Sequence, residues 1–326
     1  MRNTYFDFVK FIALIGVILI HCRFPGAFGM YLQALCSFAV PVFFCVSGYF
    51  SYNDSSDDLK RKISRMTKYV FVSNAFYLVW DIWYEYVSGC SVKAFIQYVF
   101  SIKRILVFAV TNESAIRGHL WFLGALLYCY IFVYLIKKTK NEHLIKIIMV
   151  VLFVLGYLGQ IILMANGKED KLLTYIRNWL FEGLPFFLIG YNISGARNKK
   201  ALSKIKIQKN ILALLCCCFV VEVLIVGSGY VYYLSVLPIV IITVLLAQGA
   251  GSPNAIIVAA ASISRKYGLY IYIIQVAVIK SADLIIKDSL LYNWLRPVLV
   301  FGVTLFLAYL VVHINQKIKI DRRVRK

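Results

Sequence analysis

The residues of this chain that could do chemistry begin in one apolar stretch near its start. The segment YFDFVKFIALIGVILIHCR carries Asp7, Lys10 and His21. At about 100° per residue, Asp7 and Lys10 both fall within about 40° of His21 around a helix, so the three share one stripe. Lys10 and His21 are about 16 Å apart along the helix axis.

This stripe has two interpretations. Ionisable residues within a membrane are costly and usually have a task, which favours a polar seam that lines a cavity. A neutral imidazole there could take a proton from the hydroxyl of an acceptor molecule. In the alternative, Lys10 extends to the inner headgroups and His21 lies near the outer ones, without a role in catalysis.

The composition is that of a polytopic membrane protein. The chain has 326 residues, 61% of them hydrophobic, and a mean hydropathy of +0.76. The net charge of +21 is typical of basic cytoplasmic loops, so we predict a lipid bilayer and no nucleic acid as partner. The eight cysteines form no CxxC spacing and the histidines are dispersed, so no metal site, disulfide framework or permanently bound cofactor is predicted.

The elements that must position these groups are membrane-spanning helices, each of about 20 mostly apolar residues. The spans predicted on that rule are 5–25, 31–51, 69–87, 119–136, 145–165, 179–195, 210–228, 230–248, 267–286 and 294–314. The segment 92–110 is apolar but holds three basic residues, so we predict an interfacial or re-entrant segment there. Most of the 36 basic residues then lie on the side of the N-terminus, which favours ten spans with both termini cytoplasmic. We therefore expect one all-α domain over residues 1–326, with no appended soluble domain.

The second span ends in AVPVFFCVSGYF, where Ser47 and Gly48 allow close helix approach or a local opening of the backbone. Ser47 is therefore a candidate for contact with substrate, although ordinary packing of small residues would explain the pattern as well.

A basic cluster, LKRKISRMTKYVF, follows at the cytoplasmic end of the third span. We predict that Arg61, Lys62 and Arg65 bind the phosphates of an anionic cytosolic substrate such as coenzyme A. Lys62 and Arg65 are three apart and would face the same side of a helix. Positive-inside charge that contacts lipid headgroups is the alternative.

Further polar residues lie at or within later spans. RGHLWFLGALL starts the fourth span, where His119 is either a second polar group at the outer mouth or an interfacial residue. Glu113 is close enough in sequence to pair with Arg117 or His119.

Two later segments also place charged groups within spans. Glu182 lies in FEGLPFFLIG, where a broken helix could line a cavity and offer the carboxylate to a substrate. Lys280 and Asp283 are three apart and are expected to pair within the ninth span.

Several of these residues together resemble a known family. Asp7, Lys10 and His21 in YFDFVKFIALIGVILIH, then VFFCVSGYF, KISR and HLWFL, resemble the acyltransferase-3 family of integral-membrane acyltransferases in order and spacing. The resemblance implies about ten helices and the transfer of acyl groups from cytosolic acyl-CoA to extracytoplasmic glycans, usually as O-acetylation. It also implies that His21 is the essential histidine, since Lys10 stands at the spacing of the family's basic residue.

The same resemblance assigns roles and shows two departures. His21 would be the general base or an acyl-relay nucleophile, with Asp7 and Lys10 further inward along the stripe. Lys62 stands where arginine is common, which keeps the charge but loses a bidentate contact with phosphate. In RKYGLYIYIIQ, Gln275 stands where many members have histidine, so a role for a second histidine is in doubt.

The function that these observations favour is a multi-pass O-acyltransferase of the bacterial plasma membrane. Its donor substrate would be acetyl-CoA or another acyl-CoA, and its acceptor a glycan or lipid-linked glycan. Two other classes remain open: a transporter-like module without acyl transfer, and a structural membrane partner in polysaccharide export. Only the enzyme would consume acyl-CoA and lose activity on His21→Ala while it stays folded.

Overall fold

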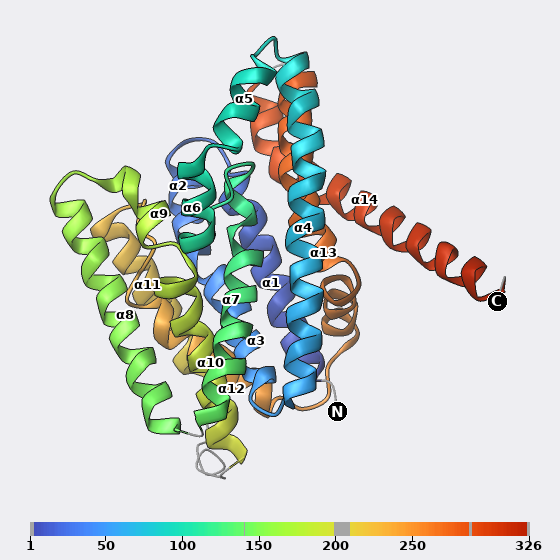
Figure 1. Cartoon of the computed structure of the whole chain (residues 1–326). Helices are drawn as coiled ribbons and strands as arrows, with labels where there is room; N and C mark the ends of the chain where they lie inside the picture. Colours follow the sequence, from blue (N-terminus) through green and yellow to red (C-terminus); the bar gives the residue numbers. More distant parts are fainter. Residues whose placement is uncertain (1–2, 140, 199–208, 287–288, 325–326) are drawn as a thin grey trace. The chain divides into compact units, whose positions relative to one another are not determined.

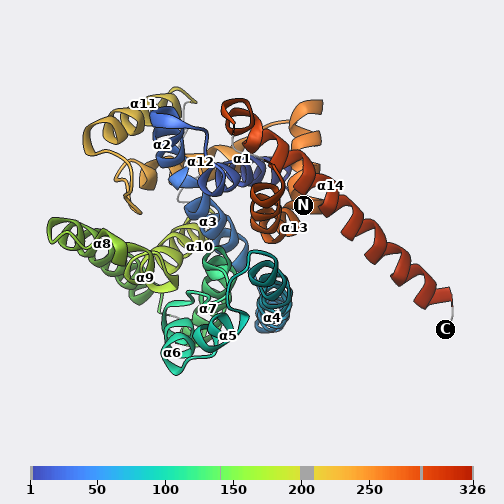
Figure 2. The same ribbon diagram turned by 90° about the horizontal axis from the view of Figure 1, so that it is seen from above.

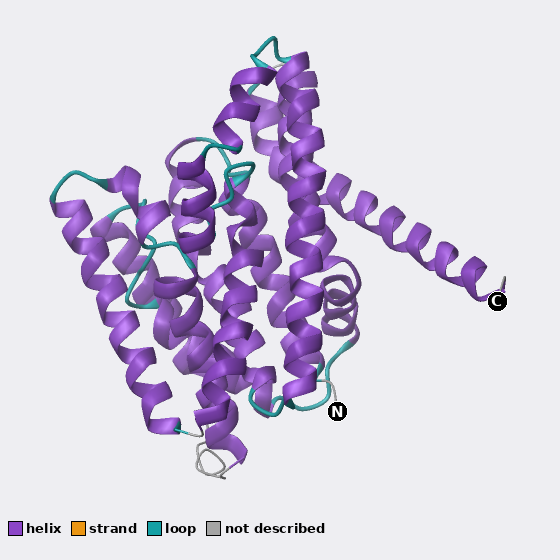
Figure 3. Cartoon of the chain, viewed as in Figure 1, coloured by secondary structure: helices purple, strands orange, loops and turns teal. Residues whose placement is uncertain are grey.

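The computed structural model describes residues 3–139, 141–198, 209–286 and 289–324. Within these ranges all regular structure is helical and no strand is present, as Figure 3 shows. Helices satisfy their own backbone hydrogen bonds, which a chain in lipid requires. Six of the described helical segments are long and apolar enough to cross a membrane, or seven if one bent helix pair counts as a span. The predicted class, a polytopic all-α membrane protein, is confirmed.

The chain forms two compact units, which we describe separately. The first unit comprises Met1–Val42, Gln208–Ser228 and Tyr233–Lys326. The second unit comprises Phe43–Ile207 and Gly229–Tyr232.

In the first unit, α1 (Thr4–His21) is the helix that the other helices surround. It packs against α2 (Gly26–Leu35), the 3₁₀ turn η1 (Cys36–Phe38), α12 (Val236–Gly249), α13 (Ala255–Ile285) and α14 (Leu290–Val324), while α11 (Lys209–Val226) packs on α2 and α12. The start of α1 is set by Asn3, whose side chain accepts a hydrogen bond from the Tyr5 amide at 2.9 Å. Apolar side chains of α1, among them Phe6, Leu14 and Val17, are buried against these neighbours. The polar stripe therefore lies on the central helix of this unit.

The second unit holds the basic cluster and the remaining predicted site residues. Its helices are α3 (Ala39–Ser51, of which Phe43 onward belongs here), α4 (Ser56–Val87), α5 (Val92–Val99), α6 (Ile102–Thr111), α7 (Trp121–Ile136), α8 (Glu142–Ala165), α9 (Leu172–Tyr175) and α10 (Leu184–Asn198). Shorter turns are η2 (Gly118–Leu120), η3 (Lys137–Thr139), η4 (Glu169–Lys171) and the π turn η5 (Trp179–Gly183). Helix α4 packs along α7, and α8 packs along α10 (Figures 1 and 2).

Each of the ten predicted spans overlaps a helix of the described chain, but several boundaries differ. Helix α4 begins at Ser56, well before the predicted 69, because Ser55 and Asp58 form a capping box there. Helix α12 begins at Val236 rather than 230, because Gly227 and Gly229 adopt positive φ angles of 86° and 107°. The segment 92–110 is the bent pair α5 and α6, with a break of 51°, a geometry shared by a re-entrant segment and a broken span, so the predicted interfacial or re-entrant segment stays a prediction.

Helices α3 and α10 approach each other so closely that two glycines are required. A Cβ at Gly48 would lie 1.8 Å from the carbonyl oxygen of Phe187, and one at Gly190 would lie 1.8 Å from that of Cys45. Small residues permit such contact between membrane helices. Of the two interpretations of the Ser47-Gly48 pair, close helix approach is the one observed.

Candidate functional site

The predicted polar stripe lies on one uninterrupted helix in the first unit. Asp7 is buried, with 3% of its surface exposed, and accepts a hydrogen bond from Lys10 Nζ at 3.3 Å. His21 is the last residue of α1 and is half-buried. Because about 16 Å of helix separates Lys10 from His21, the Asp7–Lys10 ion pair is too far along α1 to orient the imidazole.

The end of α1 creates an environment that favours positive charge on His21. The carbonyl groups of the last helical turn carry the negative end of the helix dipole, which stabilises an imidazolium there. The side chain of Gln33 donates a hydrogen bond to the carbonyl oxygen of Ile20 at 2.6 Å and so holds this last turn in place.

A charged pair that the sequence analysis missed lies close to this end of α1. Arg296 Nη2 donates to Asp283 Oδ2 at 2.6 Å, and both charges act electrostatically on Cys22, the residue after His21. The expected pair of Lys280 with Asp283 is therefore wrong. Helix α14 packs on α13 and brings the Arg296 guanidinium to Asp283 through one hydrogen bond from Nη2. No local spacing connects Asp283 with Arg296, which lies thirteen residues further along the chain.

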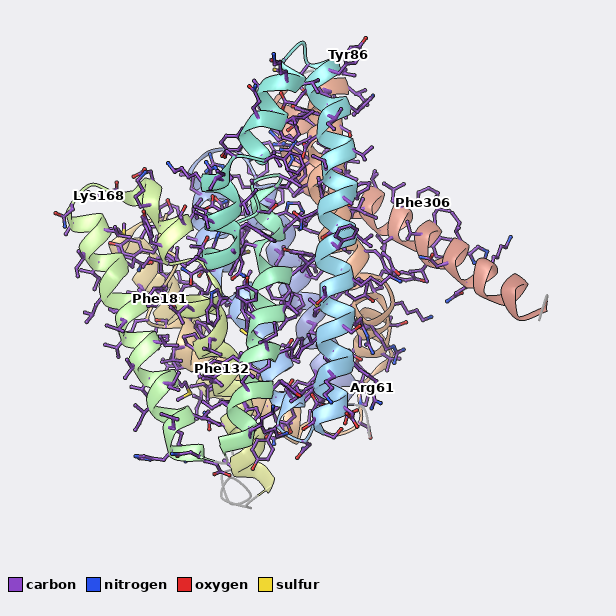
Figure 4. The ribbon with its side chains drawn as sticks, viewed as in Figure 1. Arg61, Tyr86, Phe132, Lys168, Phe181 and Phe306 are labelled. Atoms are coloured by element: carbon purple, nitrogen blue, oxygen red, sulfur yellow. The ribbon has the colours of Figure 1, made fainter. Side chains whose placement is uncertain are left out.

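In the second unit, the basic cluster begins α4, and Figure 4 labels Arg61 at this end and Tyr86 at the other. Lys62 points inward, with 27% of its side chain exposed, and donates to Asp54 Oδ2 at 2.5 Å and to Ser51 Oγ at 3.3 Å. Lys137 Nζ, a residue not predicted for the site, donates to the backbone carbonyl groups of Tyr52 and Asp54 at 2.7 and 2.5 Å. Burial lowers the pKa of Lys137, and the neighbouring Asp54 carboxylate opposes that shift. The acidic residues in NDSSDD, just before the basic run, were the signal for these pairs.

The three predicted phosphate-binding residues differ in how far they are already paired. Arg61 is exposed and donates to Asp58 at 2.5 Å. Hydrogen bonds from Ser55 and from Arg61 hold the pKa of Asp58 well below its ordinary value, so that carboxylate stays charged. Arg65 is exposed and forms no ion pair with any residue that the structure describes. Arg65 is therefore the member of the cluster whose charge is most available to a ligand.

A small cavity with a mixed polar and apolar lining adjoins the same end of the second unit. Its volume is about 150 Å³, and it is lined by Tyr52, Glu142, Lys146, Tyr191, Asn192 and Gly195, among others. The rings of Tyr52 and Tyr191 meet edge to face at 4.9 Å between centroids. The carbonyl of Tyr52, which lines this cavity, also accepts the hydrogen bond from Lys137.

Further along α4, His119 lies in η2 and is 5% exposed, so it does not lie on the surface of the second unit. Its ring packs edge to face on Tyr77, with centroids 4.9 Å apart. Glu113 does not pair with Arg117 or His119 in the described structure. It lies 3.8 Å from Arg104 and accepts a hydrogen bond from Thr174 at 2.7 Å. Arg104 lies on helix α6, which ends just before Glu113, so the fold places this guanidinium next to the Glu113 carboxylate.

Arg117 instead forms a bidentate pair with Asp81, whose side chain is 1% exposed. One of its two hydrogen bonds, from Nε to Oδ2, is 3.0 Å long, and the guanidinium also lies over the Trp80 ring at 5.2 Å. This pair joins α4 to the segment that precedes α7. It fixes the turn on which His119 stands.

Replacing Arg117 by leucine is expected to lower the free energy of unfolding by about 3–5 kcal/mol, because the buried Asp81 carboxylate would lose its guanidinium partner. Thermal unfolding of the purified protein in detergent measures the change. Lys60→Leu is the matched control, since Lys60 pairs with Asp57 at an exposed site and should unfold like wild type. Equal stability of the two variants would contradict the structural role of the Asp81–Arg117 pair.

Glu182 lies in the π turn η5 and is 4% exposed. Asn178 caps this turn by accepting hydrogen bonds from the amides of Leu180 and Phe181 at 2.9 and 3.0 Å. The helix is not broken within this segment, because the π turn continues directly into α10 at Leu184, but such a wide turn is often found at functional sites. One carboxylate oxygen of Glu182 has no hydrogen-bond partner among the described residues, so it can accept from a bound group.

Ser47 is less available than its sequence context suggested. Its hydroxyl donates to the carbonyl oxygen of Phe43 at 2.7 Å, one turn earlier on α3. A substrate would have to compete with this bond. The Ser47 hydroxyl is thus already hydrogen-bonded within α3, and its contact with substrate stays a prediction.

The comparison with known families agrees with the arrangement of these residues along the chain. The family model described as an acyltransferase domain, Acyl_transf_3, matches residues 3–313, which include the α1 stripe, the basic cluster, His119 and Glu182. No curated protein and no solved structure shows a significant match to the chain. Because the family model covers nearly the whole chain, this membrane protein belongs to the acyltransferase-3 family.

Proposed function

We propose that this membrane acyltransferase moves an acyl group, usually acetyl, from cytosolic acyl-CoA to a hydroxyl of an extracytoplasmic glycan or another cell-envelope molecule. The observation that carries the proposal is the family match, which spans the polar stripe of α1 and the basic end of α4. The positive-inside distribution supports ten spans with both termini cytoplasmic, in the plasma membrane of a bacterium. On that topology the basic end of α4 faces the compartment that holds acyl-CoA, and α1 runs outward to His21.

His21 is the proposed general base. The acceptor hydroxyl gives its proton to the imidazole while its oxygen forms a bond to the acyl carbon of the thioester. The carbon–sulfur bond then breaks, and the imidazolium returns the proton to the leaving thiolate. The carboxyl-terminal end of α1 supports this cycle because it stabilises the protonated imidazole. Asp7 and Lys10 would act further inward along the same stripe as a neutralised pair within the membrane.

The basic end of α4 is the proposed site for the phosphates of the donor. Arg65 offers an unpaired guanidinium, and Lys62 could exchange its contact with Asp54 for a phosphate oxygen. The cavity beside Tyr52, with its two tyrosine rings, Asn192 and Lys146, is suited to a planar polar base attached to such phosphates. Glu182, His119 and Ser47 remain the proposed contacts to a substrate.

Binding of radiolabelled acetyl-CoA to the purified protein in detergent tests this proposal. Arg65→Gln should raise the dissociation constant of acetyl-CoA about tenfold, because it removes the proposed charge-assisted hydrogen bond from the Arg65 guanidinium to a phosphate of the donor. Arg61→Gln is the matched control, since Arg61 is already paired with Asp58, and its dissociation constant should stay within about threefold of wild type. If folded wild-type protein shows no saturable binding, the acyltransferase proposal is wrong and a transport role gains support.

A further inference from the structure

A buried amide in the first unit has no partner. Gln275, on α13, has 0% of its surface exposed, and neither its amide nitrogen nor its oxygen forms a hydrogen bond with any residue of the described chain. Thr304, on α14, is also 0% exposed, and its hydroxyl has no partner there either. Buried polar side chains nearly always find a partner, and an unmatched one destabilises the fold because it loses its hydrogen bonds to water. Two such groups in one helix pair therefore need an explanation.

The two groups lie at the same level of the antiparallel helices α13 and α14. The Asp283–Arg296 ion pair fixes how the two helices align. Gln275 lies eight residues before Asp283 on α13, and Thr304 lies eight residues after Arg296 on α14. Because eight helical residues span about 12 Å, both side chains lie about 12 Å from the ion pair along the helix axes. On the other side of this level, Tyr267 and Tyr309 meet with ring centroids 6.3 Å apart. The amide and the hydroxyl thus lie between the same two contacts of α13 with α14.

This level adjoins the last two turns of α1, which end at His21. Helices α1 and α13 run in the same direction, since Tyr5 donates to the carbonyl of Ser252 at 3.3 Å before α13 begins. Further along, Leu14 lies beside Gly268, where an added Cβ would be 3.9 Å from Leu14 Cδ2. The charge of Asp283 reaches Cys22 at the end of α1. Gln275 lies between these two levels and so within the stretch of α1 that leads to His21.

The surroundings decide which ligand chemistry fits. The neighbouring buried residues on the two helices are apolar, among them Ile271, Ile279, Val300 and Ala308. A phosphate or carboxylate would not be stabilised there, because burial of an unpaired charge is far more costly than burial of a neutral polar group. A carboxamide both donates and accepts, and a neutral secondary amide is its complement.

We infer that Gln275 and Thr304 form a binding site for a neutral secondary amide of a substrate. This inference rests on the proposed function and deepens it. One source of the amide is the amide-bearing arm of the acyl-CoA thioester, and the other is an acetamido group on the acceptor glycan. Either would bring a substrate to the end of α1 that carries His21.

A structural glutamine of the same burial shows what Gln275 lacks. Gln160, in the second unit, is also 0% exposed, but its side chain donates to the carbonyl of Tyr232 at 2.9 Å and accepts from the amides of Val231 and Tyr232 at 2.7 and 2.8 Å. Its replacement must leave three backbone groups without partners. Replacement of Gln275 by leucine leaves none, because the described residues offer it no partner to lose.

The test compares Gln275→Leu with Gln160→Leu in thermal unfolding, acetyl-CoA binding and transfer of label from acetyl-CoA to a cell-envelope fraction. We expect Gln275→Leu to unfold at or above the wild-type temperature, whereas Gln160→Leu unfolds well below it. If the amide is on the donor, Gln275→Leu weakens binding of acetyl-CoA and of acetyl-pantetheine about tenfold each. If it is on the acceptor, donor binding is unchanged and transfer to the envelope fraction falls about tenfold. Thr304→Val should change the same substrate parameter to a smaller extent.

The inference is wrong if Gln275→Leu binds and transfers like wild type, or if it loses stability as Gln160→Leu does. Acetyl-pantetheine distinguishes the amide site from the phosphate site, because it lacks the nucleotide phosphates of acetyl-CoA. Arg65→Gln should therefore weaken the binding of acetyl-CoA but not that of acetyl-pantetheine. Failure of wild type to bind acetyl-CoA would refute the proposed function itself. The amide site alone would be refuted by a different pattern. In that case wild type binds acetyl-CoA, Arg65→Gln weakens this binding, and Gln275→Leu behaves like wild type in every assay.

Discussion

Replacing His21 by asparagine should reduce acyl transfer about 10³-fold, while acetyl-CoA still binds and the protein remains folded. General base catalysis contributes about 10²–10⁴-fold, and asparagine offers a side chain of similar polarity that cannot take up a proton. His21 is half-buried at the end of α1, so we expect its replacement by a polar residue of smaller size to leave the fold intact. The rate of transfer from labelled acetyl-CoA to a cell-envelope fraction measures the loss.

His143→Asn is the matched control for this prediction. His143 is exposed near the start of α8, and its replacement should leave transfer unchanged. Acid-quenched protein also distinguishes the two proposed roles of His21, since only an acyl relay would retain label on the wild-type chain. Activity of His21→Asn within a few-fold of wild type, together with normal folding, would exclude His21 from both roles.

Replacing Gly48 or Gly190 by alanine should destabilise the second unit by about 3 kcal/mol or more. The new Cβ would lie 1.8 Å from a carbonyl oxygen of the facing helix in each variant. Backbone atoms cannot rotate away as a side chain can, so α3 and α10 would have to separate and lose the packing between them. Thermal or denaturant-induced unfolding in detergent measures the free energy of unfolding.

Gly302→Ala provides the control for these two variants. Gly302 lies within α14, and nothing lies within 4 Å of a Cβ placed there. Alanine has the higher helix propensity, so this variant should be as stable as wild type or slightly more stable. If Gly48→Ala and Gly190→Ala unfold like Gly302→Ala, then α3 and α10 do not approach each other as described.

The helical class, the approximate spans and the family could be predicted from the sequence, because each depends on local composition and spacing. An apolar run of sufficient length in lipid must be helical, since no other partner satisfies its backbone. Asp7, Lys10 and His21 share a stripe on α1 for the same reason, as helical periodicity alone determines it. The Asp7–Lys10 contact is likewise a short-range pair within one helix.

The partners of the other charged groups were decided by tertiary structure. Asp283 pairs with Arg296 and not with Lys280, and Glu113 contacts Arg104 rather than a residue of its own segment. Each choice depends on which helix packs alongside, and sequence spacing does not contain that information. The burial of His119 against Tyr77 follows from the packing of α4 on α7 in the same way.

Two features relevant to chemistry could be seen only in the folded chain. The sequence indicated a broken helix at Glu182, but only the structure shows a π turn that leaves one carboxylate oxygen available. The sequence likewise identified Gln275 only as a departure from a family pattern. That its amide is fully buried without a partner, level with Thr304, follows from the register of α13 against α14, which Asp283–Arg296 and Tyr267–Tyr309 set. Local sequence thus determined which segments are helices and which faces are polar, whereas long-range packing decided which polar groups of the described chain have hydrogen-bond partners and which have none.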